Sequence, residues 1–217
     1  MPTPAADISD RFKTAPIVPL VQSNDPDEAV RIANALVAGG LTVLEVVLRT
    51  DAAIDCLSAI AAEVDGAIVG AGTVLDADQA DRAIAAGSQF IVSPGFDDGV
   101  TAAASNAGLP VYPGVVTATE LMRARQAGLS AVKFFPASIA GGVPALKALA
   151  SVFRSMQFMP TGGVSAANLA DYLALPSVVA CGGSWLTPAD AIRDGNYDRL
   201  TELAAEARAI AAAAGRG

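Results

Sequence analysis

Short apolar, β-branched runs alternate with helix-forming runs along nearly the whole chain, and this alternation restricts the fold more than any other feature. Strands are predicted at residues 17–22, 42–49, 67–74, 90–95, 111–116, 130–136, 157–162 and 177–184. A run with helical periodicity follows each of them, and several of these runs stop at a glycine. Eight strand–helix units in 217 residues predict one (β/α)8 barrel domain spanning residues 1–217, because such barrels commonly contain about 200–250 residues.

An open, doubly wound sheet is the main alternative to the barrel. Such a fold usually carries a glycine-rich dinucleotide turn after its first strand, whereas the turn here reads SNDP at positions 23–26. The strands are also nearly continuous apolar runs, as expected for parallel strands that are covered on both faces. The barrel is therefore preferred, and residues 4–13 are expected to form a short extra helix that closes its bottom.

Composition narrows the classes of partner. A formal net charge of −8 argues against nucleic acid, which requires a basic surface. No apolar run reaches the roughly 18 residues of a membrane span, and the start of the chain does not resemble a secretory signal. Cys56 and Cys181 lie far apart in no metal-binding pattern, so they are interpreted as reduced thiols of a cytoplasmic protein.

The chain contains no histidine. This excludes Ser-His and Cys-His mechanisms and any zinc site built on imidazole. A general base has to be Asp, Glu, Lys, Tyr or Cys, and neither a cofactor nor a metal ion is expected.

Lys133 lies in an otherwise apolar run, SAVKFFPA, at the predicted sixth strand. Burying an unpaired ammonium costs several kcal/mol, and a buried lysine can instead lose its proton. A neutral amine in a dry pocket is the nucleophile that forms a Schiff base with a carbonyl substrate. Phe135, on the same face, would keep that amine dry. The alternative is that Lys133 reaches water at the strand end or pairs with a carboxylate.

Glu45 and Arg49 lie on one face of the predicted second strand because strand side chains alternate with a period of two. Two interpretations are open. The residues form a buried ion pair, or Glu45 transfers protons while Arg49 binds a substrate carboxylate through two parallel hydrogen bonds.

Glycine, proline and hydroxyl residues gather where the other strands end, the end at which barrel enzymes hold their active sites. In the run GAGTV, the glycines permit close approach and Thr73 offers a hydroxyl. Pro94 suits a strand-end turn. The loops after strands seven and eight predict a phosphate site made of backbone N–H groups and hydroxyls, with these candidate residues: Thr161, Gly162, Gly163, Gly183 and Ser184.

These motifs occur in a specific order, and together they resemble one family. The runs VLEVVLRT, GAGTV, VSPG, YPGVVTATE, AVKFFPA, PTGGV and GGSW are similar to those of 2-keto-3-deoxy-6-phosphogluconate aldolases, a family that also includes 4-hydroxy-2-oxoglutarate aldolase activity. The resemblance covers about residues 17–185. It implies a (β/α)8 barrel, a metal-free class I mechanism without a cofactor, and a homotrimer.

The resemblance also assigns roles. It implies that Lys133 forms the Schiff base, that Glu45 is the acid/base, and that Arg49 and Thr73 hold the pyruvate carboxylate. The phosphate would be bound at Gly162, Gly163, Gly183 and Ser184, and the pocket would be completed by Pro94, Phe135 and Thr161. The implied reaction cleaves 2-keto-3-deoxy-6-phosphogluconate to pyruvate and glyceraldehyde 3-phosphate.

Several alternatives stay open at this point. A related aldolase could act on 4-hydroxy-2-oxoglutarate or on 2-keto-3-deoxy-6-phosphogalactonate. A phosphate-sugar epimerase or isomerase would need paired bases or a metal, whereas Glu45 is the only evident carboxylate at the strand ends. A barrel that only binds a sugar phosphate would not need a dry lysine.

Overall fold

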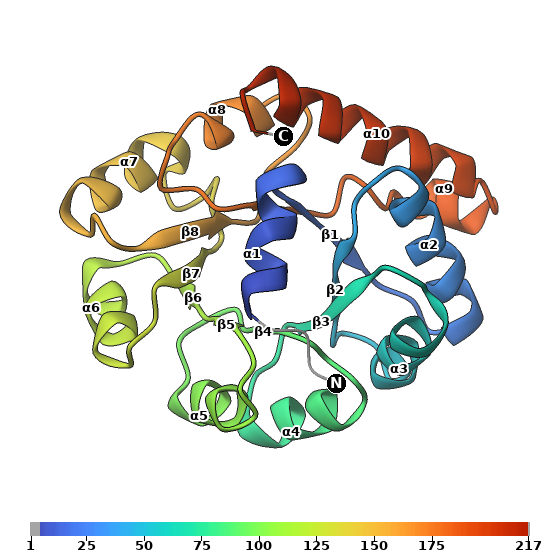
Figure 1. The fold of residues 1–217 in the computed structure, drawn as a ribbon, viewed down its shortest axis with the longest axis horizontal. Coiled ribbons are helices and arrows are strands. Elements are labelled where there is room, and N and C mark those ends of the chain that lie inside the picture. Colours follow the sequence, from blue (N-terminus) through green and yellow to red (C-terminus); the bar gives the residue numbers. More distant parts are fainter. Residues whose placement is uncertain (1–4, 217) are drawn as a thin grey trace.

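A computed structural model describes the backbone of residues 5–216 and the side chains of residues 8–216 (Figure 1). The strands are β1 (Ile17–Val21), β2 (Val43–Val47), β3 (Ile68–Gly72), β4 (Ile91–Val92), β5 (Val111–Tyr112), β6 (Gly114–Val115), β7 (Ala131–Phe134), β8 (Gln157–Pro160) and β9 (Cys181–Gly183). The helices are α1 (Ala5–Thr14), α2 (Pro26–Ala38), α3 (Ala53–Glu63), α4 (Ala77–Ala85), α5 (Asp98–Asn106), α6 (Ala118–Gln126), α7 (Gly142–Val152), α8 (Leu169–Leu173), α9 (Ala189–Arg193) and α10 (Tyr197–Ala213).

The strands form a curled parallel sheet with helices around its outside (Figure 1). One sheet has six strands in the order β5-β4-β3-β2-β1-β9, and a second has three in the order β6-β7-β8. Each neighbouring pair is parallel, as in the register that sets Glu45 beside Gly70 and Val47 beside Gly72. The predicted parallel α/β architecture is confirmed.

The expected eight-stranded barrel is interrupted at two places. The predicted strand at 111–116 is split at Pro113 into β5 and β6, which belong to different sheets. Proline has no N–H group and cannot donate to the ladder. Between residues 157–161 and residues 178–182, which include parts of β8 and β9, the pairing is limited to two isolated bridges, Phe158 with Val178 and Thr161 with Gly182. A continuous barrel ladder is therefore not shown.

Helix starts follow the capping residues that the sequence offers. The side chain of Asp25 accepts a hydrogen bond from the Asp27 N–H at the start of α2, and a capping box joins Thr117 to Glu120 at α6. The helix after β8 begins at Leu169, with Asn168 in the capping position, although Ser165 is the capping residue that the sequence offers there. Within residues 5–216, no helix is both long and apolar enough to cross a membrane.

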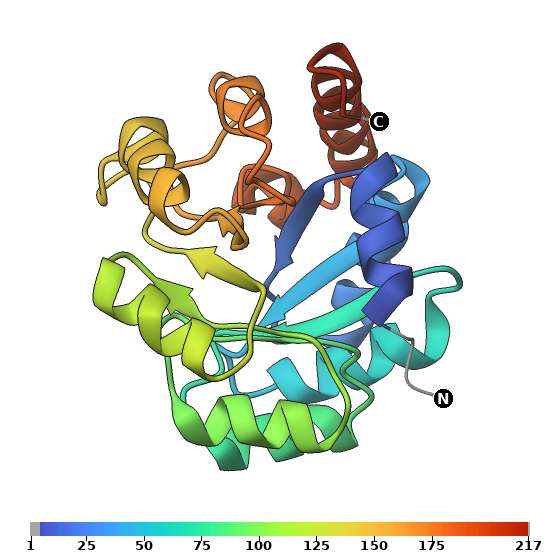
Figure 2. The ribbon, with the colours of Figure 1, turned by 60° about the vertical axis from the view of Figure 1, so that its left-hand side comes forward.

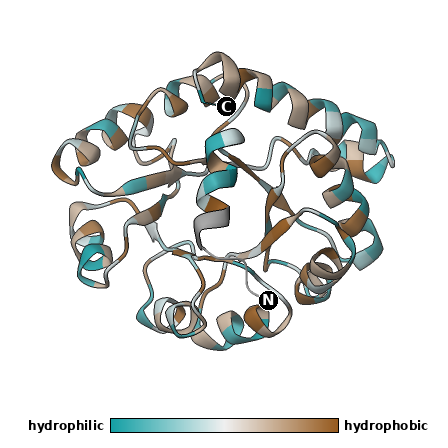
Figure 3. Ribbon diagram, viewed as in Figure 1, coloured by the Kyte–Doolittle hydropathy of each residue, from teal (hydrophilic) through white to brown (hydrophobic). Residues whose placement is uncertain are grey.

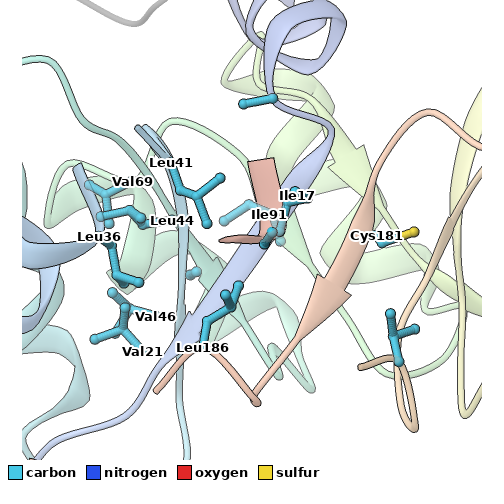
Figure 4. Packing of buried hydrophobic residues seen from close by; sticks show 14 of the residues in the cluster. Ile17, Val21, Leu36, Leu41, Leu44, Val46, Val69, Ile91, Cys181 and Leu186 are labelled. Carbon is cyan, nitrogen blue, oxygen red and sulfur yellow. The ribbon is translucent and has the colours of Figure 1, made fainter. Parts of the chain in front are cut away.

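The apolar interior has two layers. The larger layer lies between the strands and the outer helices, where Val21, Leu36 and Val46 come together (Figure 4). The smaller layer fills the space enclosed by the strands, and it contains Val18, Val43, Ile68, Phe90, Val92, Tyr112, Met159 and Ala180. Figure 3 shows hydrophilic stretches on the outer helices, α10 among them. The strands are thus covered on both faces, as their apolar runs predict.

Helix α1 closes the inner layer at the amino-terminal ends of the strands. Figures 1 and 2 show it (dark blue) set apart from the ring of outer helices. Its Ile8 and Phe12 are buried in the inner layer, and the Phe12 ring meets Tyr112 edge to face at 6.5 Å between centroids. Burial there raises the pKa of Tyr112 to about 12. The predicted closing helix is confirmed, although its expected first residue, Pro4, lies outside the described residues.

Replacing Phe12 by alanine is expected to lower the free energy of unfolding by about 3–5 kcal/mol, because it leaves a cavity in the inner layer. Urea unfolding at fixed protein concentration measures this loss. Val152→Ala is the control, since that side chain is 74% exposed and its loss should change the same quantity by about 0.5 kcal/mol or less. A loss below about 1 kcal/mol for Phe12→Ala would mean that α1 does not seal the sheet.

Candidate active site

The two residues that the sequence marks most strongly meet inside the molecule. Lys133 comes from β7 in the small sheet and Glu45 from β2 in the large sheet, and Lys133 Nζ lies 3.1 Å from Glu45 Oε1. Their exposed fractions are 4% and 0%. Lys133 therefore pairs with a carboxylate and does not reach out to water. The Glu45–Arg49 ion pair considered from the sequence is wrong, because the partner of Glu45 is Lys133.

The second carboxylate oxygen of Glu45 is free. Oε2 is buried and has no hydrogen-bond partner among the described residues. Burying an acceptor without a partner costs the free energy of its lost hydration. The presence of this unpaired oxygen therefore indicates that Glu45 has a functional role. Glu45 can thus hold a proton shared with Lys133 through one oxygen and accept a proton from another molecule through the other.

Gly72 makes room for Glu45. A methyl group built on Gly72, which faces Val47 across β2 and β3, would overlap the carboxylate of Glu45. At Gly70, the same methyl group would come within 2.5 Å of the Phe90 ring. The GAG run therefore permits close approach, as predicted, and the groups that approach are side chains of this protein.

Phe135 forms the apolar wall expected beside the lysine. The Lys133 Nζ lies 5.3 Å from the centre of its ring, a distance at which a cation and an aromatic face attract. The ring also borders the loop after β8, since a methyl group on Gly162 would lie 3.3 Å from it. Main-chain hydrogen bonds from Ala137 to Thr161 and from Ser138 to Gly162 tie the two loops together.

Arg49 and Thr73 form a second polar pair. The Arg49 Nε donates to Thr73 Oγ1 at 3.2 Å, and among the described residues no carboxylate lies within 4 Å of the guanidinium. Thr73 has a φ of +61°, a conformation that costs a β-branched residue roughly 1–2 kcal/mol. Strain of this kind gathers at binding sites, and a guanidinium without a carboxylate partner is suited to an anion.

A cavity of about 490 Å³ opens next to these groups. Val47 lines it from the face of β2 that carries Glu45. Arg49 lines it from the turn after β2, where the Arg49 N–H donates to the Val47 carbonyl. Ser184 lines it from the end of β9. Lys133 and Glu45 are buried and are not part of its lining, although Glu45 is only two residues before Val47 on β2. One cavity thus touches both Arg49 and Ser184.

The residues of the predicted phosphate site differ in whether their polar groups are available to an anion. Thr161 is buried, and a methyl group on Gly182 would overlap its hydroxyl. Within residues 5–216, the backbone N–H groups of Gly163 and Ser184 have no protein acceptor, so they can bind an anion. Gly183 has another reason to be glycine, because the Trp185 indole packs where its side chain would be.

Pro94 makes no contact that ties it to the Lys133–Glu45 pair in the described structure. Its carbonyl packs against Gly114, where a methyl group would overlap it. Pro94 itself is half-buried. The contacts at this position are those of a strand-end turn, which is how the sequence is most simply interpreted there.

The cavity also contains residues that the sequence analysis missed, namely Gln22, Glu28, Thr187 and Arg193. Gln22 could have been found, since it continues the inward alternation of Val18 and Leu20. Glu28 and Arg193 belong to helices, and only their packing brings them to the strand ends. Across residues 5–216, no group of three Cys, Asp or Glu side chains is arranged to hold a metal ion.

A buried amine paired with a carboxylate, beside a cavity that holds a free guanidinium, is the arrangement of an enzyme that forms a Schiff base with an anionic carbonyl compound. The chain belongs to the KDPG and KHG aldolase family, whose sequence profile matches residues 8–203. This membership favours lyase chemistry over the epimerase, isomerase and binding-only alternatives.

Named relatives agree with this assignment. The KHG/KDPG aldolase of Escherichia coli K12 is 52% identical, over 89% of this chain and 91% of its own. The 2-keto-3-deoxy-6-phosphogluconate aldolase of Zymomonas mobilis ZM4, solved with 3-phosphoglycerate, has a TM-score of 0.87 and 44% identity, over 94% of this chain and 96% of its own. The KDPG aldolase of Legionella pneumophila was solved with pyruvate as a covalent carbinolamine. It has a TM-score of 0.87 and 40% identity, over 91% of this chain and 96% of its own.

Gly72→Ala is expected to lower kcat for aldol cleavage by about 10² or more, approaching the effect of Glu45→Gln, because the added methyl group displaces the Glu45 carboxylate. Steady-state kinetics measures the effect, and circular dichroism checks the fold. Gly95→Ala is the matched control, since a methyl group there meets nothing within 4 Å. Turnover of Gly72→Ala within about twofold of the unchanged enzyme would show that the position of Glu45 is not critical.

Proposed function

We propose that the protein cleaves 2-keto-3-deoxy-6-phosphogluconate to pyruvate and glyceraldehyde 3-phosphate through a Schiff base on Lys133. The observation that carries the proposal is the buried contact between Lys133 Nζ and Glu45 Oε1. The names of the relatives support the substrate, and the carbinolamine in the Legionella pneumophila enzyme supports the covalent route.

Formation of the Schiff base uses both members of the pair. Glu45 takes a proton from the Lys133 ammonium, and the neutral amine attacks the C2 ketone to give a carbinolamine. Proton transfer through Glu45 then lets the hydroxyl leave as water, which produces an iminium ion. The wall formed by Phe135 keeps the amine from being hydrated and reprotonated by bulk solvent.

Carbon–carbon cleavage follows from the iminium ion. Glu45, directly or through a water molecule, removes the proton of the C4 hydroxyl, and the C3–C4 bond breaks as the C4–O bond becomes a carbonyl. The electron pair of the broken bond moves into the iminium and forms an enamine, while glyceraldehyde 3-phosphate leaves. Protonation of the enamine at C3 and hydrolysis then release pyruvate and restore Lys133.

The two ends of the substrate would be held at opposite sides of the cavity. Arg49 and Thr73 would bind the carboxylate, with Arg49 offering paired donors. Gly162, Gly163, Gly183 and Ser184 would bind the phosphate, mainly through N–H groups, and Pro94, Phe135 and Thr161 would complete the pocket. The 3-phosphoglycerate held by the Zymomonas mobilis enzyme also carries one carboxylate and one phosphate.

Cleavage of 4-hydroxy-2-oxoglutarate is the second candidate, because the Escherichia coli relative is named for both activities. The free N–H groups of Gly163 and Ser184 favour the phosphorylated substrate. The galactonate epimer, 2-keto-3-deoxy-6-phosphogalactonate, shares both anionic ends and would need kinetic comparison.

We propose further that the two sheets are parts of one eight-stranded barrel, supported by the bridges between β8 and the chain leading into β9. We also propose that the chain is a homotrimer acting in the cytoplasm. The family to which the chain belongs supports the homotrimer. The two cysteines support the cytoplasmic proposal, because Cys56 and Cys181 are free and buried. Burial also raises the pKa of both thiols.

The homotrimer predicts a particle of about three times the 21.7 kDa chain mass in light scattering after size exclusion. The mass should stay constant across micromolar protein concentrations, because interfaces of stable oligomers do not dissociate on modest dilution. A mass equal to one chain at all concentrations would refute the trimer and leave the aldolase proposal unaffected.

Borohydride reduction in the presence of pyruvate is expected to trap one pyruvate per chain, on Lys133. Intact mass gives the stoichiometry, and peptide mapping gives the residue. Lys133→Ala should show no adduct and no turnover, whereas the control Lys147→Ala should show both, since Lys147 is an exposed residue of α7. An adduct on another lysine, or none, would overturn the proposed role of Lys133.

A further inference from the structure

One carboxylate lines the cavity without an ion-pair partner. Glu28, in the first turn of α2, borders the same cavity as Arg49 and Ser184. Among the described residues, no Lys or Arg nitrogen lies within 4 Å of it. A cavity that takes a substrate with two anionic ends should avoid a negative charge, so this placement requires an explanation.

The carboxylate is also held in place. The Ser23 hydroxyl donates to Glu28 Oε2 at 2.5 Å, and Ser23 is itself 7% exposed. The Ser23 carbonyl oxygen accepts hydrogen bonds from Thr50 Oγ1 at 2.7 Å and from Cys56 Sγ at 3.6 Å. Glu28 is therefore fixed to the segment that carries Arg49, one residue before Thr50.

Helix stabilisation alone does not account for this arrangement. A negative charge is favourable in the first turn of a helix, but α2 already has Asp27 in that turn and Asp25 as its capping residue. Asp27 is exposed, whereas Glu28 is half-buried and reaches the cavity. The bond to Ser23 helps to fix the start of α2, since the same hydroxyl accepts from the N–H of Asp25. That role does not require Glu28 to line the cavity, so its place in the lining is explained by what enters the cavity.

We propose that Glu28 is a specificity-determining residue for the aldehyde half of the substrate, an inference that rests on the proposed function. A carboxylate accepts hydrogen bonds from hydroxyl groups and repels other carboxylates. The C5 carbon of 2-keto-3-deoxy-6-phosphogluconate carries a hydroxyl, and its phosphate lies one carbon farther, toward Ser184. In 4-hydroxy-2-oxoglutarate, C5 is itself a carboxylate. Glu28 therefore selects the polyol phosphate by disfavouring the dicarboxylate.

The test compares Glu28→Gln with Asp27→Asn. Both variants remove one negative charge from the same helical turn, and only the first changes the cavity. We measure kcat/KM for 2-keto-3-deoxy-6-phosphogluconate and for 4-hydroxy-2-oxoglutarate. Glu28→Gln is expected to shift the ratio about tenfold toward the dicarboxylate, while Asp27→Asn leaves it unchanged. Ser23→Ala keeps the charge of Glu28 but removes the hydrogen bond that holds its carboxylate in place, and an intermediate shift is expected.

Two further readouts separate charge repulsion from a structural role. The tenfold difference should shrink as KCl rises from about 0.02 to about 0.5 M, because salt screens the repulsion. Borohydride trapping with pyruvate alone should be equal in all variants, since pyruvate lacks the aldehyde half. An unchanged ratio in Glu28→Gln, in an enzyme that still traps pyruvate and cleaves the phosphogluconate, would overturn the role of Glu28 alone. Failure of the unchanged enzyme to trap pyruvate would overturn the proposed function, and this inference with it.

Discussion

The contact between Lys133 and Glu45 is the interaction on which the site depends. It joins a strand of the small sheet to a strand of the large one, in an interior where both charged groups are almost fully buried. Burying two charges is costly unless their geometry is good and their other bonding capacity is used. Gly72 supplies the space for the carboxylate, and Glu45 Oε2 remains available. The pair thus holds the reactive amine beside a base before any substrate arrives.

The two ends of the strands have different roles, since one end is packed for stability and the other holds the candidate active site. At the amino-terminal ends, α1 and the ring cluster around Tyr112 fill the interior with apolar side chains. At the carboxyl ends, the same inward alternation delivers Glu45, Arg49 and Lys133, and the apolar filling gives way to a cavity. The division follows from parallel strands, whose carboxyl ends all meet on one side.

Much of this arrangement can be predicted from sequence because the informative residues break a local rule. A lysine inside AVKFF and a glutamate inside VLEVV are conspicuous in buried strands. The pairing of Lys133 with Glu45, instead of Glu45 with Arg49, could not be predicted, since it depends on how two sheets face one another. The break at Pro113, the late start of α8 at Leu169 and the arrival of Glu28 in the cavity also arise from tertiary packing.

The two interruptions of the sheet have a consequence for ligand binding. They lie on either side of β6-β7-β8, so this unit, which carries Lys133, is joined to the rest of the sheet through few ladder bonds. A substrate bonded covalently to Lys133 and held by Arg49 would span the two units as a chemical crosslink. Substrate would then suppress their separation, and amide hydrogen exchange in β8, an edge strand of the three-stranded sheet, would slow more than exchange in β2, which has a neighbouring strand on each side in the six-stranded sheet.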